Sequence, residues 1–321
     1  MSKSSAIAHP IQGLIKYHGL LDPVRRIPFH DSISVCTGPI HSHTTFELTN
    51  GDQDQAVIDG KEVTGRALER IHAVVDAIRE HADDDRCWRM ESRNDFPQFV
   101  GLGSSSSGFA ALTVAAADAF GYDASMEKLS EIARLGAGSA CRAVTGGVSE
   151  WVNDGARSYS RRILAEDELD WRIVVPLVQH EEPTEGVHEE VKTSPLFEAR
   201  VAYMPEACDA LRRAAAAKDL PAIGALAEAD TLNLHAITMT GQAGHLTWQP
   251  ATIHVMQAVK RLRKEGVPVW FSIDTGATAY LNTDAAHETQ VAEAVAGIEG
   301  VADVLHLLPA GPARRVEEHL F

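Results

Sequence analysis

The sequence predicts an α+β protein built as two halves that meet near residue 180. Three observations predict this class. The first half has the residue pattern of short strands mixed with a few helices. The chain from Val187 to Gly266 has a mainly helical pattern. The turn-rich segment His180–Gly186 (HEEPTEG) separates the two. The chain has 321 residues, which agrees with two domains of roughly 100–200 residues each. We therefore expect an N-terminal domain over 1–180 and a C-terminal domain over 181–321.

The elements of the first half follow from apolar periodicity and turn residues. Asp59-Gly60 is a hairpin signal between two short apolar arms, and the apolar stretch Ala6–Gly19 is assigned no element. The expected strands are Ser32–Thr37, Thr44–Thr49, Ala56–Ile58, Glu62–Val63, Cys87–Ser92, Ser149–Val152, Ser158–Leu164 and Trp171–Val178. The expected helices are Arg66–Ala82, a helix from Phe109 that ends near Gly121, and Met126–Leu135.

The second half closes with a strand, a helix and a strand. Val267–Ile273 (VPVWFSI) has the composition of a buried strand and stops at Asp274-Thr275-Gly276-Ala277. A helix from about Asp284 to Ile298 and a last strand, Val301–Leu308, follow. A carboxylate at a strand end beside a flexible loop is a common position for a catalytic group.

The segment Asn94–Gly108 (NDFPQFVGLGSSSSG) predicts a phosphate-binding loop. Its glycines let the backbone approach a ligand, and its hydroxyls lead directly into a helix N-terminus, where free N–H groups and the helix dipole attract anions. The expected contacts to the nucleotide phosphates come from Gly101, Gly103, Ser104, Ser105, Ser106, Ser107 and Gly108.

Spacing excludes three better-known loops at this place. A Walker A loop requires Lys-Ser or Lys-Thr after Gly108, where the chain has Phe109-Ala110. A dinucleotide fingerprint requires glycine at the position of Ser106. A hydrolase nucleophile elbow requires glycine on both sides of its serine, and Ser107 occupies the second of these positions. A plain glycine-serine linker is the remaining alternative, although linkers seldom run straight into an amphipathic helix.

Composition narrows the class of partner. The net charge of −16 argues against nucleic acid or an anionic membrane surface, and 45% hydrophobic residues suffice for a core. The four cysteines form no CxxC pair, and no segment reaches the roughly 18 apolar residues of a membrane span. We expect a cytoplasmic protein with no resident metal site of its own.

Lys16, Arg142 and Asp274 are the candidate catalytic residues, because each lies among small or apolar neighbours where a lone charge is costly. Taken singly, each is equally well explained as half of a structural ion pair. Together with an anion-binding loop, the three favour an active site. Arg66 and Arg70 lie on the expected helix 66–82, and we interpret both as solvent-facing.

Four segments carry a resemblance to the GHMP kinase superfamily, within it to the mevalonate diphosphate decarboxylase group, and most of all to its phosphomevalonate decarboxylases. They are IKYHGLLD with IPFHDSISV (from Ile15 and Ile27), NDFPQFVGLGSSSSGFAAL, LSEIARLGAGSACRAVTGG (Leu129–Gly147) and SIDTGATA (Ser272–Ala279). The resemblance implies a two-domain fold with a ribosomal-S5-like N-terminal half and a ferredoxin-like C-terminal half. It also implies ATP with Mg²⁺ and a homodimer.

The implied reaction is ATP-dependent decarboxylation of a phosphorylated mevalonate. By resemblance, Asp274 engages the 3-hydroxyl, Arg142 holds the carboxylate, and Lys16 lies beside the transferring phosphoryl group. The resemblance places Tyr17, His18, Ser139, Arg142 and Thr184 at the substrate.

Two departures from the family pattern bear on the substrate. Leu20 stands where the family has a second lysine, and Glu182-Pro183 replace a serine pair before Thr184. The site would bind less negative charge, which favours mevalonate 5-phosphate, giving isopentenyl phosphate, over the 5-diphosphate. His18 replaces a tryptophan, as a ligand-facing donor or as a core substitute.

Other functions stay open at this point. A mevalonate 3-kinase characteristically lacks the catalytic aspartate, and a non-catalytic relative would be expected to lose one of the three charged residues. A metal-dependent hydrolase is favoured by the fifteen histidines and the pair His41-Ser42-His43, but the sequence has no HExxH motif. Ser125-Met126-Glu127-Lys128 matches a β-lactam-enzyme motif, but is better explained as a helix start with Ser125 as its cap.

Overall fold

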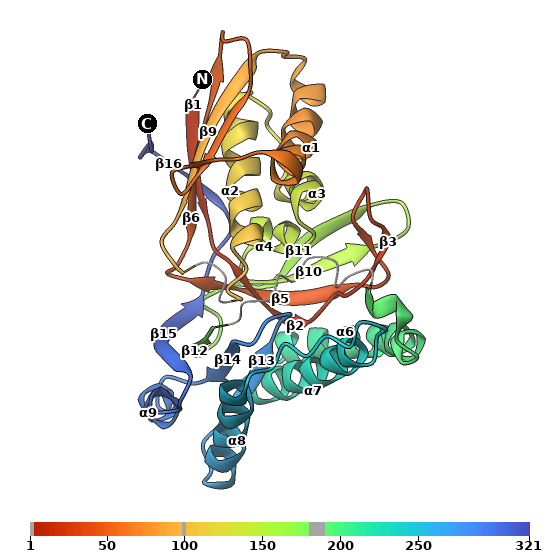
Figure 1. Ribbon diagram of the computed structural model, residues 1–321, viewed down its shortest axis with the longest axis vertical. Coiled ribbons are helices and arrows are strands. Elements are labelled where there is room, and N and C mark those ends of the chain that lie inside the picture. The colour runs from red at the N-terminus through yellow and green to blue at the C-terminus, as the bar shows by residue number, and fades with distance from the viewer. Residues whose placement is uncertain (1–2, 98–100, 180–189) are drawn as a thin grey trace.

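The computed structural model describes residues 3–97, 101–179 and 190–321, and shows an elongated molecule with two sheets (Figure 1). The first sheet has the order β16-β1-β6-β9-β7-β8 and is antiparallel except where β7 runs parallel to β9. Its strands are β1 (Lys3–Ala8), β6 (Ser42–Thr49), β7 (Gln55–Ile58), β8 (Lys61–Glu62), β9 (Cys87–Asn94) and β16 (Arg314–Val316). The helices α1 (Gly65–Ala82), α2 (Ser104–Ala119) and α3 (Met126–Gly136) cover one face, and the short α4 (Ala140–Thr145) follows.

The second sheet joins strands from both ends of the chain, in the order β11-β10-β5-β15-β12-β14-β13, with β2 paired to β5. Its strands are β2 (Ile11–Ile15), β5 (Ser32–Gly38), β10 (Val148–Asn153), β11 (Ser158–Leu164), β12 (Arg172–Val178), β13 (Trp270–Ile273), β14 (Ala279–Thr283) and β15 (Val301–Pro309). Below it lie η1 (Val191–Thr193), α6 (Phe197–Ala216), α7 (Leu220–Met239), α8 (Pro250–Lys264) and α9 (Glu288–Ala296). A small hairpin, β3 (Leu20–Asp22) with β4 (Ile27–Pro28), stands at the side.

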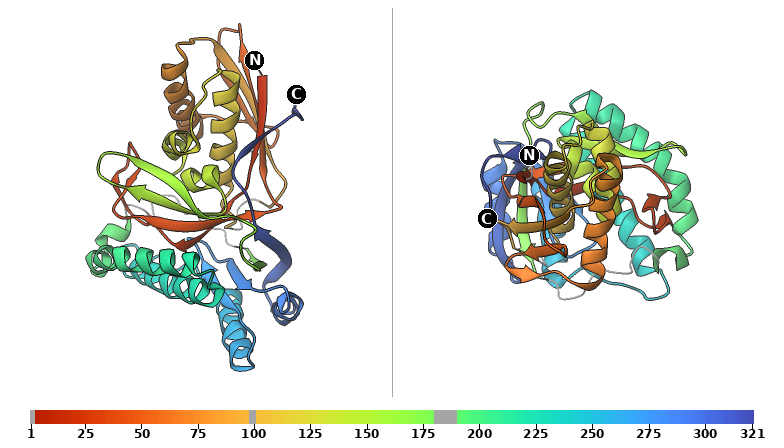
Figure 2. Two further views of the ribbon diagram at one scale, coloured as in Figure 1. Left: turned by 180° about the vertical axis from the view of Figure 1, so that it is seen from behind. Right: turned by 90° about the horizontal axis from the view of Figure 1, so that it is seen from above.

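The C-terminal segment returns to the first sheet (Figure 2, left). β15 pairs with β5, β16 pairs with β1, and the Ser5 hydroxyl lies 2.7 Å from Nδ1 of His319. β12, which precedes residue 180, pairs only with β14 and β15. The expected boundary between residues 180 and 181 lies within residues 180–189, which are outside the described part of the chain, and it stays a prediction.

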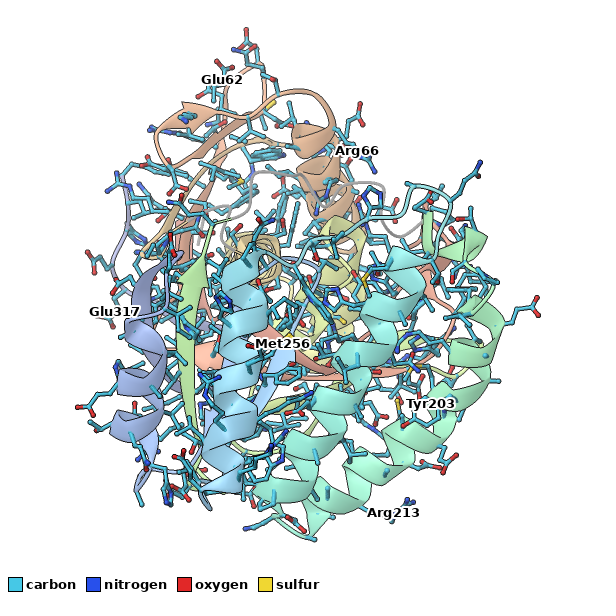
Figure 3. The ribbon with its side chains drawn as sticks, turned by 60° about the horizontal axis from the view of Figure 1, so that its bottom comes forward. Glu62, Arg66, Tyr203, Arg213, Met256 and Glu317 are labelled. Carbon is cyan, nitrogen blue, oxygen red and sulfur yellow. The ribbon has the colours of Figure 1, made fainter. Side chains whose placement is uncertain are left out.

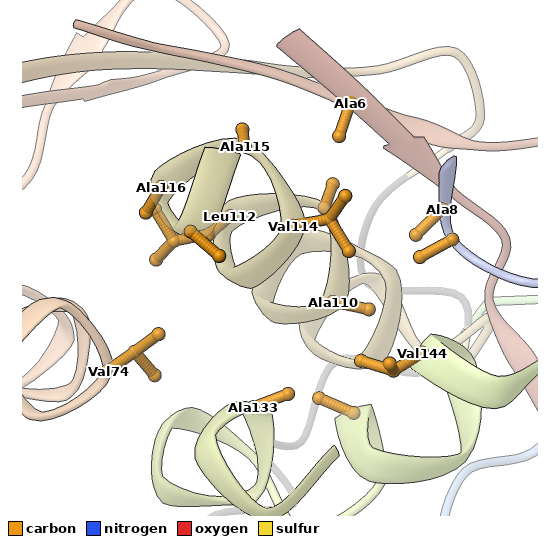
Figure 4. Close-up of a cluster of buried hydrophobic side chains, with 14 of the residues drawn as sticks. Ala6, Ala8, Val74, Ala110, Leu112, Val114, Ala115, Ala116, Ala133 and Val144 are labelled. Carbon is orange, nitrogen blue, oxygen red and sulfur yellow. The ribbon is translucent and has the colours of Figure 1, made fainter. Parts of the chain in front are cut away.

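The core of the upper layer depends on the small side chains of α2 (Figure 4). Ala110 and Ala115 are fully buried, and the helix packs closely on β1 through Ala6 and Ala8. Alanine combines the highest helix propensity with the least bulk, so the helix can lie near a sheet and two other helices at once. This packing fixes the direction in which the N-terminus of α2 points.

Most expected elements are confirmed, including β5, β6, the β7–β8 hairpin, α1 and α3. The strand β11 has the predicted bounds at both ends. The elements not predicted from the sequence are short and mostly lack alternation: β1, β2, β3, β4, β14, β16 and α4. β13 begins at Trp270 rather than Val267, because Pro268 cannot donate to a ladder. The expected serine loop is instead the first turn of α2. Among the helices of the described residues, none has the length and hydropathy needed to cross a bilayer.

The crossing of the C-terminal segment over Gly146 makes a test of the fold. Gly146 and Gly155 both have positive φ, but a Cβ on Gly146 would lie 2.1 Å from the backbone nitrogen of Pro312, whereas one on Gly155 would meet nothing within 4 Å. We expect Gly155→Ala to cost about 1 kcal/mol of unfolding free energy for its φ alone. Gly146→Ala should cost roughly 3–4 kcal/mol because overlap is added. Urea unfolding measures both, and equal costs would contradict this packing.

Candidate active site

The expected phosphate-binding segment, residues 101–108, lies at the start of α2, and we call it the phosphate turn. Gly101 and Gly103 have φ values of 80° and 76°, and α2 begins directly after them at Ser104. Such values suit glycine and turn the chain sharply into the helix. The first N–H groups of a helix have no partner within it, and the dipole adds positive charge there. The turn is therefore built to face an anion.

The four serines of this turn have different surroundings. The Ser106 hydroxyl donates to the Gly103 carbonyl at 2.6 Å, and the Ser107 hydroxyl lies 2.6 Å from that of Ser42. Both of these side chains are buried, while Ser104 is partly exposed and Ser105 is exposed. Two hydroxyls are thus engaged inside the protein, and two face outward.

A pocket opens beside this turn, between α1, α2 and the strands β7 and β9. Its polar lining includes Ser92, Asn94 and Arg70. Arg70 donates through Nε to the Gly136 carbonyl at 2.7 Å, with its guanidinium 4.8 Å from the centre of the Phe109 ring. The interpretation of Arg70 as solvent-facing was wrong, whereas Arg66 is exposed (Figure 3).

The loop after β13 touches the phosphate turn. A Cβ placed on Gly276 would lie 3.5 Å from the Cα of Gly101, so the two backbones pass close to each other. The Tyr280 hydroxyl, on β14, donates to the Gly101 carbonyl at 3.2 Å. Asp274, two residues before Gly276, is therefore held near the start of α2.

Lys16 and Asp274 meet at β2, which lies close to β13 and α7 (Figure 1). The Gly13 N–H donates to the two carboxylate oxygens of Asp274 at 3.1 and 3.2 Å. Lys16 Nζ donates to the Gly13 carbonyl at 3.0 Å, to Ser272 Oγ at 2.9 Å and to Thr231 Oγ1 at 3.1 Å. Residues from the two ends of the chain thus form one hydrogen-bonded cluster.

Burial moves the two pKa values of this cluster toward each other. Desolvation lowers the pKa of Lys16, and the charges of Asp274 and Asp230 partly oppose it. Desolvation raises the pKa of Asp274, opposed by Lys16, the Gly13 N–H and Arg142. A carboxylate with a raised pKa accepts a proton more readily than an exposed one, which suits a general base.

Arg142, on α4, is near enough to the cluster for its charge to lower the pKa of Asp274. Its Nη1 donates to the Ser32 hydroxyl, and its guanidinium lies 5.5 Å from the Tyr17 ring centre and 5.7 Å from that of Trp151. Its buried Nε has no hydrogen-bond partner among the described residues. A cationic N–H group in this position is available to an anionic ligand.

An ion pair that was not predicted from the sequence holds the backbone of Lys16. Asp230 on α7 accepts from the Lys16 N–H at 2.8 Å and from Arg200 Nη1 at 3.0 Å, and Arg200 on α6 donates to the Lys16 carbonyl at 2.7 Å. The available signal was a charge inside two alanine-rich helices, which also describes many solvent-facing residues.

The remaining expected substrate residues are placed as follows. Tyr17 is partly buried against Trp151, with ring centres 4.8 Å apart, and His18 is buried. Ser139 is the partly exposed residue before α4. Thr184 lies outside the described residues, as do Glu182 and Pro183.

Two family models match most of the chain. The diphosphomevalonate decarboxylase-like N-terminal domain matches residues 8–161, and the mevalonate 5-diphosphate decarboxylase C-terminal domain matches residues 174–307. The chain is 48% identical to the phosphomevalonate decarboxylase of Haloferax volcanii over 98% of both chains. It is 28% identical to the diphosphomevalonate decarboxylase of Candida albicans, covering 90% of this chain and 86% of that one.

Solved structures agree with the implied two-domain fold. The mevalonate diphosphate decarboxylase of Staphylococcus aureus superposes with a TM-score of 0.92 at 27% identity, covering 98% of both chains. A decarboxylase designated MDDEF, solved in complex with MVAPP, the ATP analogue AMPPCP and magnesium, has a TM-score of 0.88 at 25% identity, covering 98% of this chain and 99% of that one. The chain belongs to the diphosphomevalonate decarboxylase family of the GHMP kinase superfamily.

Proposed function

We propose that this enzyme is an ATP-dependent decarboxylase that converts mevalonate 5-phosphate to isopentenyl phosphate. The observation that carries the proposal is the contact between the Asp274 loop and the phosphate turn, with the Lys16 ammonium in the same cluster. This arrangement supports phosphoryl transfer to an alcohol beside a carboxylate. The 48% identity to a protein named phosphomevalonate decarboxylase supports the substrate.

In the first step the 3-hydroxyl oxygen of the substrate attacks the γ-phosphorus of ATP. The bond between this phosphorus and the oxygen that bridges it to the β-phosphate breaks, and ADP leaves. A tertiary alcohol is a hindered nucleophile, so alignment and removal of its proton both matter. Asp274 would accept the proton, because burial raises the pKa of its carboxyl group. Lys16, beside it, would stabilise negative charge on the transferring group.

In the second step phosphate and CO₂ leave the phosphorylated intermediate, and the electrons of the carbon–carboxylate bond form the double bond. Arg142 would hold the carboxylate through its guanidinium. Tyr17, His18, Ser139 and Thr184 would complete the substrate site. An ionised Asp274 would also stabilise positive charge that develops at the carbon losing phosphate.

The nucleotide would bind along the N-terminus of α2. Gly101, Gly103, Gly108 and the serines Ser104–Ser107 would surround its phosphates, and the pocket between α1 and β9 would take the nucleoside. The fit rests on the positive φ values of the turn and its exposed hydroxyls. Magnesium bound with the nucleotide would neutralise part of the charge on its phosphates. The described residues contain no group of three His, Cys, Asp or Glu side chains placed to hold a metal ion.

The choice of the monophosphate rests on a lost cation. Leu20, where the family motif has a second lysine, is buried in the β3–β4 hairpin. Each charge-assisted hydrogen bond is worth about 1.5–3 kcal/mol, so a site lacking one should hold a diphosphate less tightly. Mevalonate 5-diphosphate is the second candidate substrate, favoured by the family descriptions and by the name of the C. albicans relative.

We expect the purified enzyme with Mg-ATP to release CO₂ faster from mevalonate 5-phosphate than from the 5-diphosphate, with at least about a tenfold difference in kcat/KM for 1.4 kcal/mol of lost binding. Labelled CO₂ release measures both. Leu20→Lys should reduce the ratio of kcat/KM for the monophosphate to kcat/KM for the diphosphate, because it restores a cation. A preference for the diphosphate in the unaltered enzyme would overturn the substrate proposal.

We expect Asp274→Asn to lower kcat by at least about 10²- to 10⁴-fold, the usual range for a lost general base. ATP should still bind, as measured by calorimetry, because the phosphate turn is unchanged. Asp284→Asn is a matched control, since Asp284 also directly follows a strand of the second sheet, β14, but contacts His287 instead. Retained turnover in Asp274→Asn would remove the role given to Asp274.

We also propose that the enzyme is a cytoplasmic homodimer that associates through α7. The exposed side chains of this helix include Ala225, Ala229, Leu232 and Met239, and none of its exposed side chains is charged. Their helical spacing places these four residues along one stripe of α7, and the helix lies between α6, which carries Tyr203, and α8, which carries Met256 (Figure 3). At a net charge of −16, a stripe without charged side chains lets two copies approach with less electrostatic repulsion than a charged face would. The cysteines are free thiols, which suits a reducing compartment.

We expect Leu232→Lys to convert the dimer to monomer, because it places a charge in the centre of the stripe. Sedimentation velocity at micromolar concentration measures the change. Gln257→Lys, on the exposed face of α8, serves as control and should leave the mass unchanged. A monomeric unaltered enzyme, or a dimeric Leu232→Lys variant, would contradict association through α7.

A further inference from the structure

The hydroxyl of Thr231, on α7, uses all of its hydrogen-bonding capacity at the candidate active site. It donates to the Ala227 carbonyl at 2.8 Å, and it accepts from Lys16 Nζ at 3.1 Å and from the Ile273 N–H at 3.1 Å. A hydroxyl has one proton and two lone pairs, so no further partner fits. The side chain is fully buried.

These bonds join the two catalytic candidates into a closed circuit. Ile273 is the last residue of β13 and directly precedes Asp274, whose carboxylate accepts from the Gly13 N–H. The Gly13 carbonyl in turn accepts from Lys16 Nζ, which returns to Thr231. Thr231 is therefore the point at which α7 fixes the end of β13 and the Lys16 ammonium relative to each other.

Helix stability alone does not explain why a threonine stands at position 231. Threonine is a weak helix former, and a bond to the carbonyl four residues earlier does not stabilise a helix. Thr238, two turns along α7, offers a comparison. It is buried and donates to the Leu234 carbonyl at 3.0 Å, with no second partner for its hydroxyl among the described residues.

We propose that Thr231 is a positioning residue that sets the Lys16 ammonium against the Asp274 carboxylate for phosphoryl transfer. The proposal rests on the proposed function, because it assumes that these two groups act together on the transferring phosphoryl group. Thr231 itself touches neither substrate nor nucleotide in this account. Its effect should therefore fall on kcat rather than on binding.

The test compares Thr231→Val, which keeps the shape and removes the hydroxyl, with Thr231→Ser, which keeps the hydroxyl. We expect Thr231→Val to lower kcat by about 30- to 100-fold, since small misplacements of reacting groups cost up to roughly 10²-fold. KM for both substrates should change by less than about threefold. Thr231→Ser should recover most of the lost kcat. Thr238→Val, which removes a buried hydroxyl from the same helix, should leave kcat near that of the unaltered enzyme.

A pH profile separates positioning from a general loss of structure. Lys16 is faced by Asp274 after β13, by Asp230 and His235 on α7, and by Arg200 on α6. All four remain in Thr231→Val, which removes only an acceptor from the ammonium. The alkaline limb of the kcat profile should therefore move to lower pH in that variant. Thr231→Ser should restore its position, and an unmoved limb in Thr231→Val would overturn the proposal.

Two outcomes distinguish this proposal from the proposed function. If the unaltered enzyme prefers mevalonate 5-diphosphate, the substrate proposal fails, and the same variants test Thr231 on that substrate. If it decarboxylates neither, the function fails, and a double-mutant cycle of Thr231→Val with Lys16→Met tests the contact by urea unfolding. Additive effects would then overturn the proposal, and coupling would support it. Should Thr231→Val not fold, Thr231→Ala carries the same expectations.

Discussion

The burial of one ammonium group, that of Lys16, constrains the rest of this structure. A charge with 5% of its residue surface exposed is tolerated only with close partners. Lys16 obtains them from three elements: β2, which ends directly before it, supplies the Gly13 carbonyl, β13 supplies the Ser272 hydroxyl, and α7 supplies the Thr231 hydroxyl. The Arg200–Asp230 pair fixes its backbone on both sides. The relative placement of β2, β13, α6 and α7 thus serves a single side chain.

The same site also depends on glycines, because a side chain at these positions would collide with its neighbours. A Cβ on Gly13 would lie 2.7 Å from Asp274 Oδ1, so any other residue would displace the carboxylate from its N–H partner. Gly101 and Gly276 let the phosphate turn approach the Asp274 loop. Close backbone contact fixes the distance between carboxylate and phosphate site more firmly than flexible side chains could.

The sequence predicted those features of the site that break a local pattern. Lys16, Arg142 and Asp274 were identifiable because each is a charge within a small or apolar segment. Thr231, Asp230 and Arg200 were not, because polar residues in a long helix usually face solvent and only the packing shows that these do not. β2 was missed because a strand buried on both faces lacks alternation. The inward turn of Ser106 and Ser107 depends on where α2 begins, which Gly103 decides through its φ.

Two buried arginines differ in whether a carboxylate of the protein compensates their charge. Arg200 is 2% exposed and pairs with Asp230, so its charge is compensated within the fold. Arg142 is 3% exposed, yet its partners in the described part of the chain are the Ser32 hydroxyl and two aromatic faces, with no carboxylate. Cation–π contacts offset only part of the desolvation cost. Under the proposed function, the carboxylate of the substrate would supply the missing counter-charge. Because no carboxylate among the described residues pairs with this guanidinium, its contact to the substrate would end when CO₂ leaves without a rearrangement of the core.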